Sequence, residues 1–189
     1  MDDGRSLRAF VALEVPGDVL DSLASFQREL SATGADIKLV ERENLHFTVK
    51  FLGEISDAQA AEADSRLKKL TLKSARLEVK GVGAFPSPSR PRVVWAGIQR
   101  EQEGLVVPTA QAVIDSLDGI GERDDRPFQL HITLARVRSG RNVRELQDVI
   151  NRNASRSFGT ADLAALKLKS SQLTPQGPVY RDVGAYQLT

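Results

Sequence analysis

The sequence predicts a fold of mixed helices and strands that is built from two similar halves. Segments typical of strands and helices occur in the same order twice: strand, helix, histidine-bearing strand, helix, strand. The only two histidines among the 189 residues stand in the matching stretches "LHFTV" and "LHITL", 131 − 46 = 85 residues apart. An internal duplication explains both observations.

The first half begins with the apolar run "LRAFVALEV" (7–15), a strand that Pro16 and Gly17 end. Asp18 is a candidate N-cap for the helix that follows, in which apolar residues recur at helical spacing as far as Gly34. The remaining segments are a histidine strand over 37–55 with a polar turn at 41–44, a helix from Ser56 to about residue 72, and a strand over 76–85.

The same order returns after the Pro- and Ser-rich loop at 86–91. We interpret this loop as the junction between two lobes of a single domain that spans residues 1–189. Pro108 is tolerated in a first helical turn, so the next helix should begin near it. The other predicted segments are strands over 92–98, 128–138, 163–174 and 179–188, and a helix over 143–154.

The composition removes several kinds of site. The absence of cysteine excludes thiol catalysis, thiolate metal sites and disulfides, and it agrees with a reducing cytoplasm. A net charge of +1 means that any anion site must come from local placement of Arg and Lys. The N-terminal residues do not resemble a signal peptide, and no run approaches the roughly 20 apolar residues of a membrane span. We therefore expect a soluble, cytoplasmic protein.

Each histidine strand has one apolar and one polar face. Because side chains alternate, His46, Thr48 and Lys50 share the polar face of the first strand. His131 and Thr133 share the polar face of the second. In each strand the imidazole and the hydroxyl lie about 7 Å apart, and a two-fold axis between the halves would bring both polar faces to one cleft. A lone strand histidine is more often structural, but two in the same setting favour a shared functional site.

Paired acid–base catalysis on a phosphodiester suits these residues best. The sequence has no Gly-x-Ser-x-Gly element and no phosphate-cradling Gly-rich loop, and zinc would need ligands that we cannot identify. A neutral histidine can take a proton from the nucleophile while a protonated one gives a proton to the leaving oxygen, since the ordinary pKa is about 6.5. Threonine hydroxyls can bind phosphoryl oxygens, and Arg or Lys can offset their charge. This chemistry needs no metal and no other cofactor.

The stretches "RAFVALEVP", "ENLHFTVKFLGE", "GAFPSPSRPRVVWAGI", "RPFQLHITLAR" and "LKLKSSQLTPQGPVYRDVGAYQL" resemble the 2H phosphoesterases from end to end. They are most similar to the RNA 2′,3′-cyclic phosphodiesterases of bacteria and archaea, once called 2′-5′ RNA ligases. The resemblance implies an α+β, bilobal fold, with two pseudo-symmetric antiparallel sheets facing a central cleft and helices packed outside. It implies hydrolysis of terminal RNA 2′,3′-cyclic phosphates to 2′-phosphomonoesters.

The resemblance also assigns roles. His46 would be the proton donor to the leaving 3′-oxygen, and His131 the proton acceptor that activates water. Thr48 and Thr133 would bind the phosphate oxygens, and Arg136 matches a basic residue that the family places near the phosphate. Because the two halves are symmetric, reversing the reaction exchanges the donor and the acceptor.

For several positions near the two motifs, strand alternation or the family resemblance leaves the role of the side chain open. Strict alternation puts Arg136 on the apolar face with Leu130, so a bulge or a strand end would have to redirect it. Phe10 and Trp95 could stack on a base but are more typical of a core. Leu39 stands where relatives often carry an aromatic residue, and Leu130 replaces a common proline.

Other functions stay open at this stage. The substrate could be another cyclic nucleotide or ADP-ribose cyclic phosphate, or the same transfer could run in reverse as 2′-5′ ligation. A non-catalytic module that binds RNA ends would keep the same cleft. In each case we expect a monomer whose partners are RNA ends or small cyclic nucleotides, and no membrane.

Overall fold

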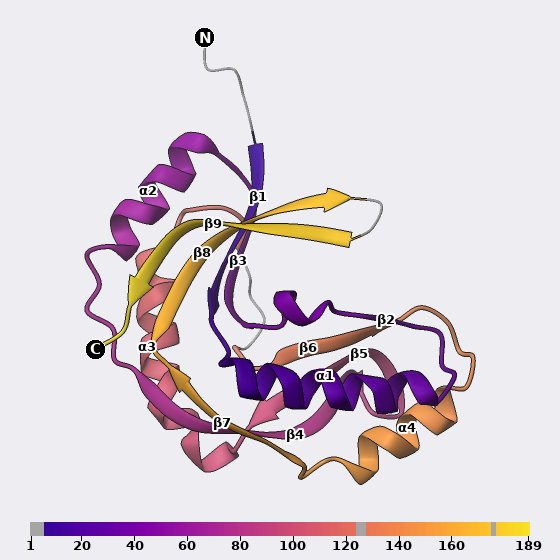
Figure 1. Ribbon diagram of the computed structural model, residues 1–189. Coiled ribbons are helices and arrows are strands. Elements are labelled where there is room, and N and C mark those ends of the chain that lie inside the picture. Colours follow the sequence, from indigo (N-terminus) through magenta and orange to yellow (C-terminus); the bar gives the residue numbers. More distant parts are fainter. Residues whose placement is uncertain (1–5, 124–127, 175–176) are drawn as a thin grey trace.

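The strands of this computed structural model pair into one curved antiparallel sheet with helices on its outer side (Figure 1). Residues 6–123, 128–174 and 177–189 are described. The strands are β1 (Ser6–Leu13), β2 (Ile37–Leu39), β3 (Phe47–Ser56), β4 (Ala75–Ser87), β5 (Arg90–Ile98), β6 (Ile132–Val137), β7 (Ser157–Leu163), β8 (Ala165–Thr174) and β9 (Gly177–Gln187). The helices are α1 (Gly17–Ala32), α2 (Asp57–Leu67), α3 (Glu103–Ser116) and α4 (Val143–Arg152), with short 3₁₀ turns η1 (Arg42–Asn44) and η2 (Arg100–Gln102).

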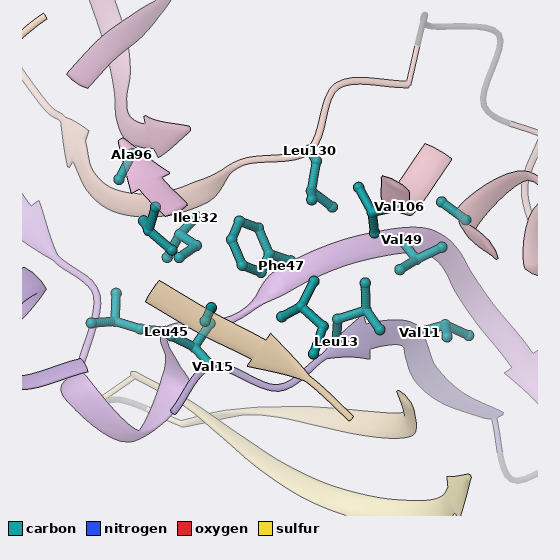
Figure 2. Packing of buried hydrophobic residues seen from close by; sticks show 14 of the residues in the cluster. Val11, Leu13, Val15, Leu45, Phe47, Val49, Ala96, Val106, Leu130 and Ile132 are labelled. Atoms are coloured by element: carbon teal, nitrogen blue, oxygen red, sulfur yellow. The ribbon is translucent and has the colours of Figure 1, made fainter. Parts of the chain in front are cut away.

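Two half-sheets meet at a single residue pair. The strand order is β7-β4-β5-β6-β3-β1-β8-β9, with β2 also on β6, and β3 pairs with β6 only through Phe47 and Ile132. Both side chains are fully buried and point into the same hydrophobic cluster (Figure 2). The predicted α+β class is confirmed. The two sheets that the family resemblance implies are present as two halves of one continuous sheet, because this pair bridges them.

The two halves of the chain exchange strands. The first half-sheet contains β3, β1, β8 and β9, and the second contains β6, β5, β4 and β7. Helices α2 and α3 pack against β3, and α3 also reaches β4, while α1 contacts β6 and β7 and α4 contacts β4 and β5. Each half-sheet therefore takes strands and a helix from both halves of the sequence.

The loop at 86–91 is not the junction between lobes. It forms the turn of the β4–β5 hairpin, where Ser87 pairs with Arg90, and both strands belong to the second half-sheet. The Pro and Ser residues do mark a turn, but a turn composition does not say which strands it connects. The chain passes between the half-sheets elsewhere, for example from β7 to β8.

The remaining differences from the sequence prediction are local. Helix α3 begins at Glu103, so Pro108 lies in its second turn, and the carbonyl of exposed Gly104 loses its helical donor. The first part of the strand predicted over 37–55 is the short β2, which the polar turn separates from β3. The sequence does not predict β7, whose Gly159 has a φ of 111°. None of the described helices has the length and apolar character that crossing a membrane requires.

Candidate active site

The junction between β3 and β6 brings the two histidine stretches together. Each histidine directly precedes its strand. The residues that follow the two histidines, Phe47 and Ile132, form the one pair that joins the strands. Extending this antiparallel register by one residue on either side sets His46 opposite Thr133 and Thr48 opposite His131. Directly opposite side chains are about 5 Å apart and diagonal ones about 7–8 Å, so all four reach one place. A local two-fold axis passes through the junction.

Backbone carbonyls orient both imidazoles. Nδ1 of His46 lies 2.6 Å from the carbonyl oxygen of Asn44, and Nδ1 of His131 lies 2.7 Å from that of Gln129. A carbonyl can only accept, so each Nδ1 carries a proton that it donates. In the neutral ring Nε2 is then the basic nitrogen, and in His46 it accepts from the Thr48 hydroxyl at 3.0 Å. The same two-residue spacing therefore fixes Nδ1 as the protonated nitrogen of both neutral rings.

The surroundings of His46 favour its neutral form. Burial lowers the pKa of His46 to about 4; the backbone hydrogen bond to Asn44 opposes this shift, and the charges of Lys169 and His131 add to it. Lys169 also forms an ion pair with Asp182, with 2.6 Å between Nζ and Oδ1. His46 is therefore uncharged at pH 7 in the free protein, and its response to His131 places both rings in one electrostatic environment.

An aromatic residue supports each imidazole. Phe10 and Trp95 are 95 − 10 = 85 residues apart, the same offset as the histidines. The Phe10 ring stacks on His46 with 4.9 Å between centroids, and the Trp95 ring lies 6.4 Å from His131. Phe85 contacts His131 edge-on at 5.0 Å. Phe10 is buried and lines the pocket beside His46, and Trp95 is partly buried, so each ring packs against one imidazole.

A pocket of about 310 Å³ opens beside His46. Four of the five predicted site residues line it, His46, Thr48, Thr133 and Arg136, whereas His131 does not. Its other lining residues include the cations Arg8 and Lys38, the acid Glu41, and the apolar or aromatic residues Leu39, Phe51, Leu173, Pro178 and Tyr180. Three cations against one carboxylate suit an anionic ligand, and the apolar wall suits a ligand that also carries a flat or apolar group.

A β-bulge turns Arg136 into this pocket. Val94 and Trp95 of β5 pair with Ala135 and Thr133 of β6, so Leu134 is an extra residue in β6. Leu134 and Ala135 are consecutive and both buried, and Arg136 then emerges exposed on the side of Thr133. The bulge at Leu134 is therefore the feature that turns Arg136 away from the apolar face, as the sequence requires.

The equivalent bulge in β3 presents a different side chain, and this difference breaks the symmetry of the site. Val49 is an extra residue of β3 relative to β1, and it places Phe51 rather than Lys50 on the side of His46. The prediction that Lys50 shares the polar face is therefore wrong, and Phe51, 48% exposed, lines the pocket instead. Because 136 − 51 = 85, Phe51 and Arg136 are equivalent positions. The 85-residue offset of the repeat could have identified Phe51 as a residue of the site, whereas strict alternation placed it on the apolar face.

The arrangement can bind an anion and move protons on either side of it. One imidazole, two hydroxyls and a guanidinium line the pocket, and the strand register places the second imidazole, His131, diagonally across from His46. These are the kinds of group that acid–base cleavage of a phosphodiester requires. Among the described residues, no three His, Cys, Asp or Glu side chains form a group that could hold a metal ion.

Comparisons with known proteins agree with this geometry. The family model LigT like Phosphoesterase matches residues 13–95 and 104–180. The RNA 2′,3′-cyclic phosphodiesterase of Archaeoglobus fulgidus is 37% identical over 96% of this chain and 100% of its own length. The protein of the same name from Aeropyrum pernix is 35% identical over 84% of this chain and 90% of its own.

Solved structures share the fold. E. coli LigT complexed with 3′-AMP superposes with a TM-score of 0.81 at 22% identity, covering 98% of this chain and 99% of that one. The protein TT0787 of Thermus thermophilus gives 0.78 at 27% identity, covering 96% and 98%. With the family model matching most of the sequence, the chain belongs to the LigT-like family of 2H phosphoesterases.

Proposed function

We propose that this protein hydrolyses the terminal 2′,3′-cyclic phosphate of RNA to a 2′-phosphomonoester by two-histidine acid–base catalysis. The observation that carries the proposal is the pairing of two His–Thr units across one strand junction, beside a pocket with three cations. The relatives named RNA 2′,3′-cyclic phosphodiesterase, up to 37% identical, support this choice of substrate.

In the proposed mechanism the phosphorus lies between the two imidazoles. His131 takes a proton from water as its oxygen bonds to phosphorus, and His46 gives a proton to the 3′-oxygen as the P–O3′ bond breaks. The hydroxyls of Thr48 and Thr133 donate to the two non-bridging oxygens, and Arg136 offsets the charge that develops on them. The product keeps the phosphate on the 2′-oxygen, and each histidine ends in the state in which the other began.

The donor role of His46 depends on the substrate. With a pKa of about 4 in the free protein, His46 is neutral at pH 7. A phosphodiester anion beside the ring favours the charged form and raises the pKa, so substrate binding supplies the condition for protonation. The two-fold arrangement permits the opposite assignment as well, which an experiment on the leaving group distinguishes.

The first test uses cytidine 2′,3′-cyclic phosphate in the presence of EDTA. We expect hydrolysis to cytidine 2′-phosphate, and we expect His46→Ala and His131→Ala each to lower kcat by about a hundredfold or more. No hydrolysis, loss of activity with EDTA, or exclusive formation of the 3′-phosphate would contradict the proposal. Full activity in either variant would refute the paired mechanism.

The second test assigns the two roles with a p-nitrophenyl phosphodiester, whose leaving group departs without a proton. H46A should then regain most of its activity relative to the unmodified protein, because the donor is no longer needed. H131A should stay impaired, because the attacking water still needs a base. The reverse pattern would exchange the two assignments.

We also propose that the protein acts as a monomeric single domain in the cytoplasm, on RNA ends or small cyclic nucleotides. The absence of cysteine supports a reducing compartment. Light scattering should give the mass of one chain, as a monomer requires. Unfolding should occur in one cooperative transition, as a single domain requires. Comparing kcat/KM for an RNA with a cyclic phosphate end, cyclic CMP and ADP-ribose cyclic phosphate tests the substrate preference.

A further inference from the structure

A buried amide behind the cleft takes no part in the proposed chemistry. Gln27 of α1 is 5% exposed, and its Nε2 donates to the carbonyl oxygens of Val40, at 2.7 Å, and Leu134, at 2.9 Å. The Leu134 carbonyl also accepts from the backbone N–H of Val40 at 2.9 Å. A polar group this deeply buried is retained only where its hydrogen bonds are made, and both amide hydrogens here meet main-chain acceptors.

The two carbonyls belong to the segments that form the site. Leu134 is the extra residue of the β6 bulge, two positions before Arg136. Val40 is the residue at which the chain leaves β2 for the short turn that leads to His46. Beyond Leu39 the main-chain bonding of this segment to β6 ends with that one bond from Val40 to Leu134, and β6 has not yet met β3. The side chain of Gln27 fills a gap in the main-chain hydrogen bonding of the sheet.

The bulge needs this support because its position decides where Arg136 points. A strand that slips by one residue moves every side chain to the opposite face, and here that face is the hydrophobic core. No ion pair holds Arg136 in the part of the chain that the structure describes, so the direction of its backbone governs the position of its guanidinium. An amide anchored on a packed helix can hold the Leu134 carbonyl without entering the cleft.

We propose that Gln27 is a positioning residue, which fixes the Leu134 bulge from behind and thereby aims Arg136 at the phosphate. This inference rests on the proposed function, since it takes Arg136 as the phosphate contact. Gln27 touches neither the substrate nor the catalytic rings. Its effect should therefore be transmitted through Arg136 and should disappear when Arg136 is absent.

The test is a double-mutant cycle with Gln27→Met, which keeps the length of the side chain and removes the donor. In the protein with Arg136 we expect Q27M to lower kcat/KM for cyclic CMP, and to weaken binding of inorganic phosphate in calorimetry, each by about tenfold. In the Arg136→Ala background the same change should cost less than about twofold. Equal losses in both backgrounds would show a general structural effect and overturn the inference.

Thr109→Val is the matched control. Thr109 is 6% exposed on α3, and its hydroxyl donates to the Lys73 carbonyl at 3.2 Å, so T109V also removes a buried hydrogen bond from side chain to main chain. T109V should lower the free energy of unfolding without changing phosphate affinity. If Q27M does not fold, Gln27→Asn withdraws the amide by one methylene and enters the same cycle.

The variants distinguish a failure of the proposed role of Arg136 from a failure of the inference about Gln27. If R136A binds phosphate as tightly as the unmodified protein, the proposed role of Arg136 fails. If R136A weakens phosphate binding while Q27M and Q27N leave it unchanged, only the inference about Gln27 fails. Phosphate binding is read without turnover, so both outcomes can be recognised whatever the nucleotide substrate is.

Discussion

The partly buried, neutral state of His46 predicts how stability changes with pH. Its pKa is about 4 in the folded protein, mainly because of burial, and about 6.5 in an unfolded chain. Between these values the unfolded state binds more protons, so the free energy of unfolding falls as the pH decreases from 6.5 to 4. The full difference is about 3 kcal/mol, of which about 2 kcal/mol is lost between pH 7 and pH 4.5.

The comparison that isolates this contribution is between the unmodified protein and His46→Gln. Urea unfolding at several pH values gives the free energy of unfolding for both, and equal m-values show that the unfolding transition is the same. Carboxylates titrate in both proteins, so their contribution cancels in the difference. The unmodified protein should lose about 2 kcal/mol more than H46Q over this range. Parallel curves would refute the burial argument and with it the statement that free His46 is neutral.

Three further changes test other parts of the site. Thr48→Val removes a phosphate donor and should lower kcat by about a hundredfold, whereas Thr48→Ser should keep most of the activity. Phe51→Ala should lower kcat/KM for cyclic CMP by about tenfold, if a base stacks on the exposed ring, while Lys50→Ala should not change it. Gly83→Ala should cost about 1–3 kcal/mol in urea unfolding, because the new Cβ would collide with the Trp95 ring; unchanged stability would show that Trp95 moves freely.

Local patterns were sufficient to predict much of the site. Alternation along a strand depends only on neighbouring residues, so the shared face of His46 and Thr48, and of His131 and Thr133, could be predicted from the sequence. The repeat indicated that the two faces meet. The site residues lie at one junction because each histidine precedes the one residue pair that joins β3 to β6.

The parts that the sequence did not predict depend on the neighbouring strand. A bulge is defined by two residues facing one across a ladder, so neither Val49 nor Leu134 carries a signal of its own. One extra residue reverses the faces beyond it, which is why alternation failed at Lys50 and Phe51. The loop at 86–91 shows the same limit, since its composition indicated a turn but not which strands it connects.

The two-fold arrangement explains why duplication suits this reaction. In an in-line displacement the attacking and leaving oxygens stand on opposite sides of phosphorus, and each needs one proton transfer. In the proposed mechanism, two copies of a His–Thr strand supply one histidine and one phosphate donor to each side. Such a site has no preferred direction until an asymmetric pair of residues supplies one, and Phe51 and Arg136, which stand at equivalent positions and both line the pocket, are such a pair.

Exchanging this pair should therefore exchange the roles of the histidines. Arg136→Phe alone removes the charge near the phosphate and should lower kcat/KM by about a hundredfold. The double variant F51R/R136F returns a guanidinium to the opposite side, so it should recover part of that loss with the substrate turned about the local axis. In this background the p-nitrophenyl phosphodiester should restore activity to H131A rather than H46A, because His131 now faces the leaving oxygen. If F51R/R136F is no more active than R136F, or if H46A is still the variant restored, then the Phe51–Arg136 pair does not set the direction of the reaction.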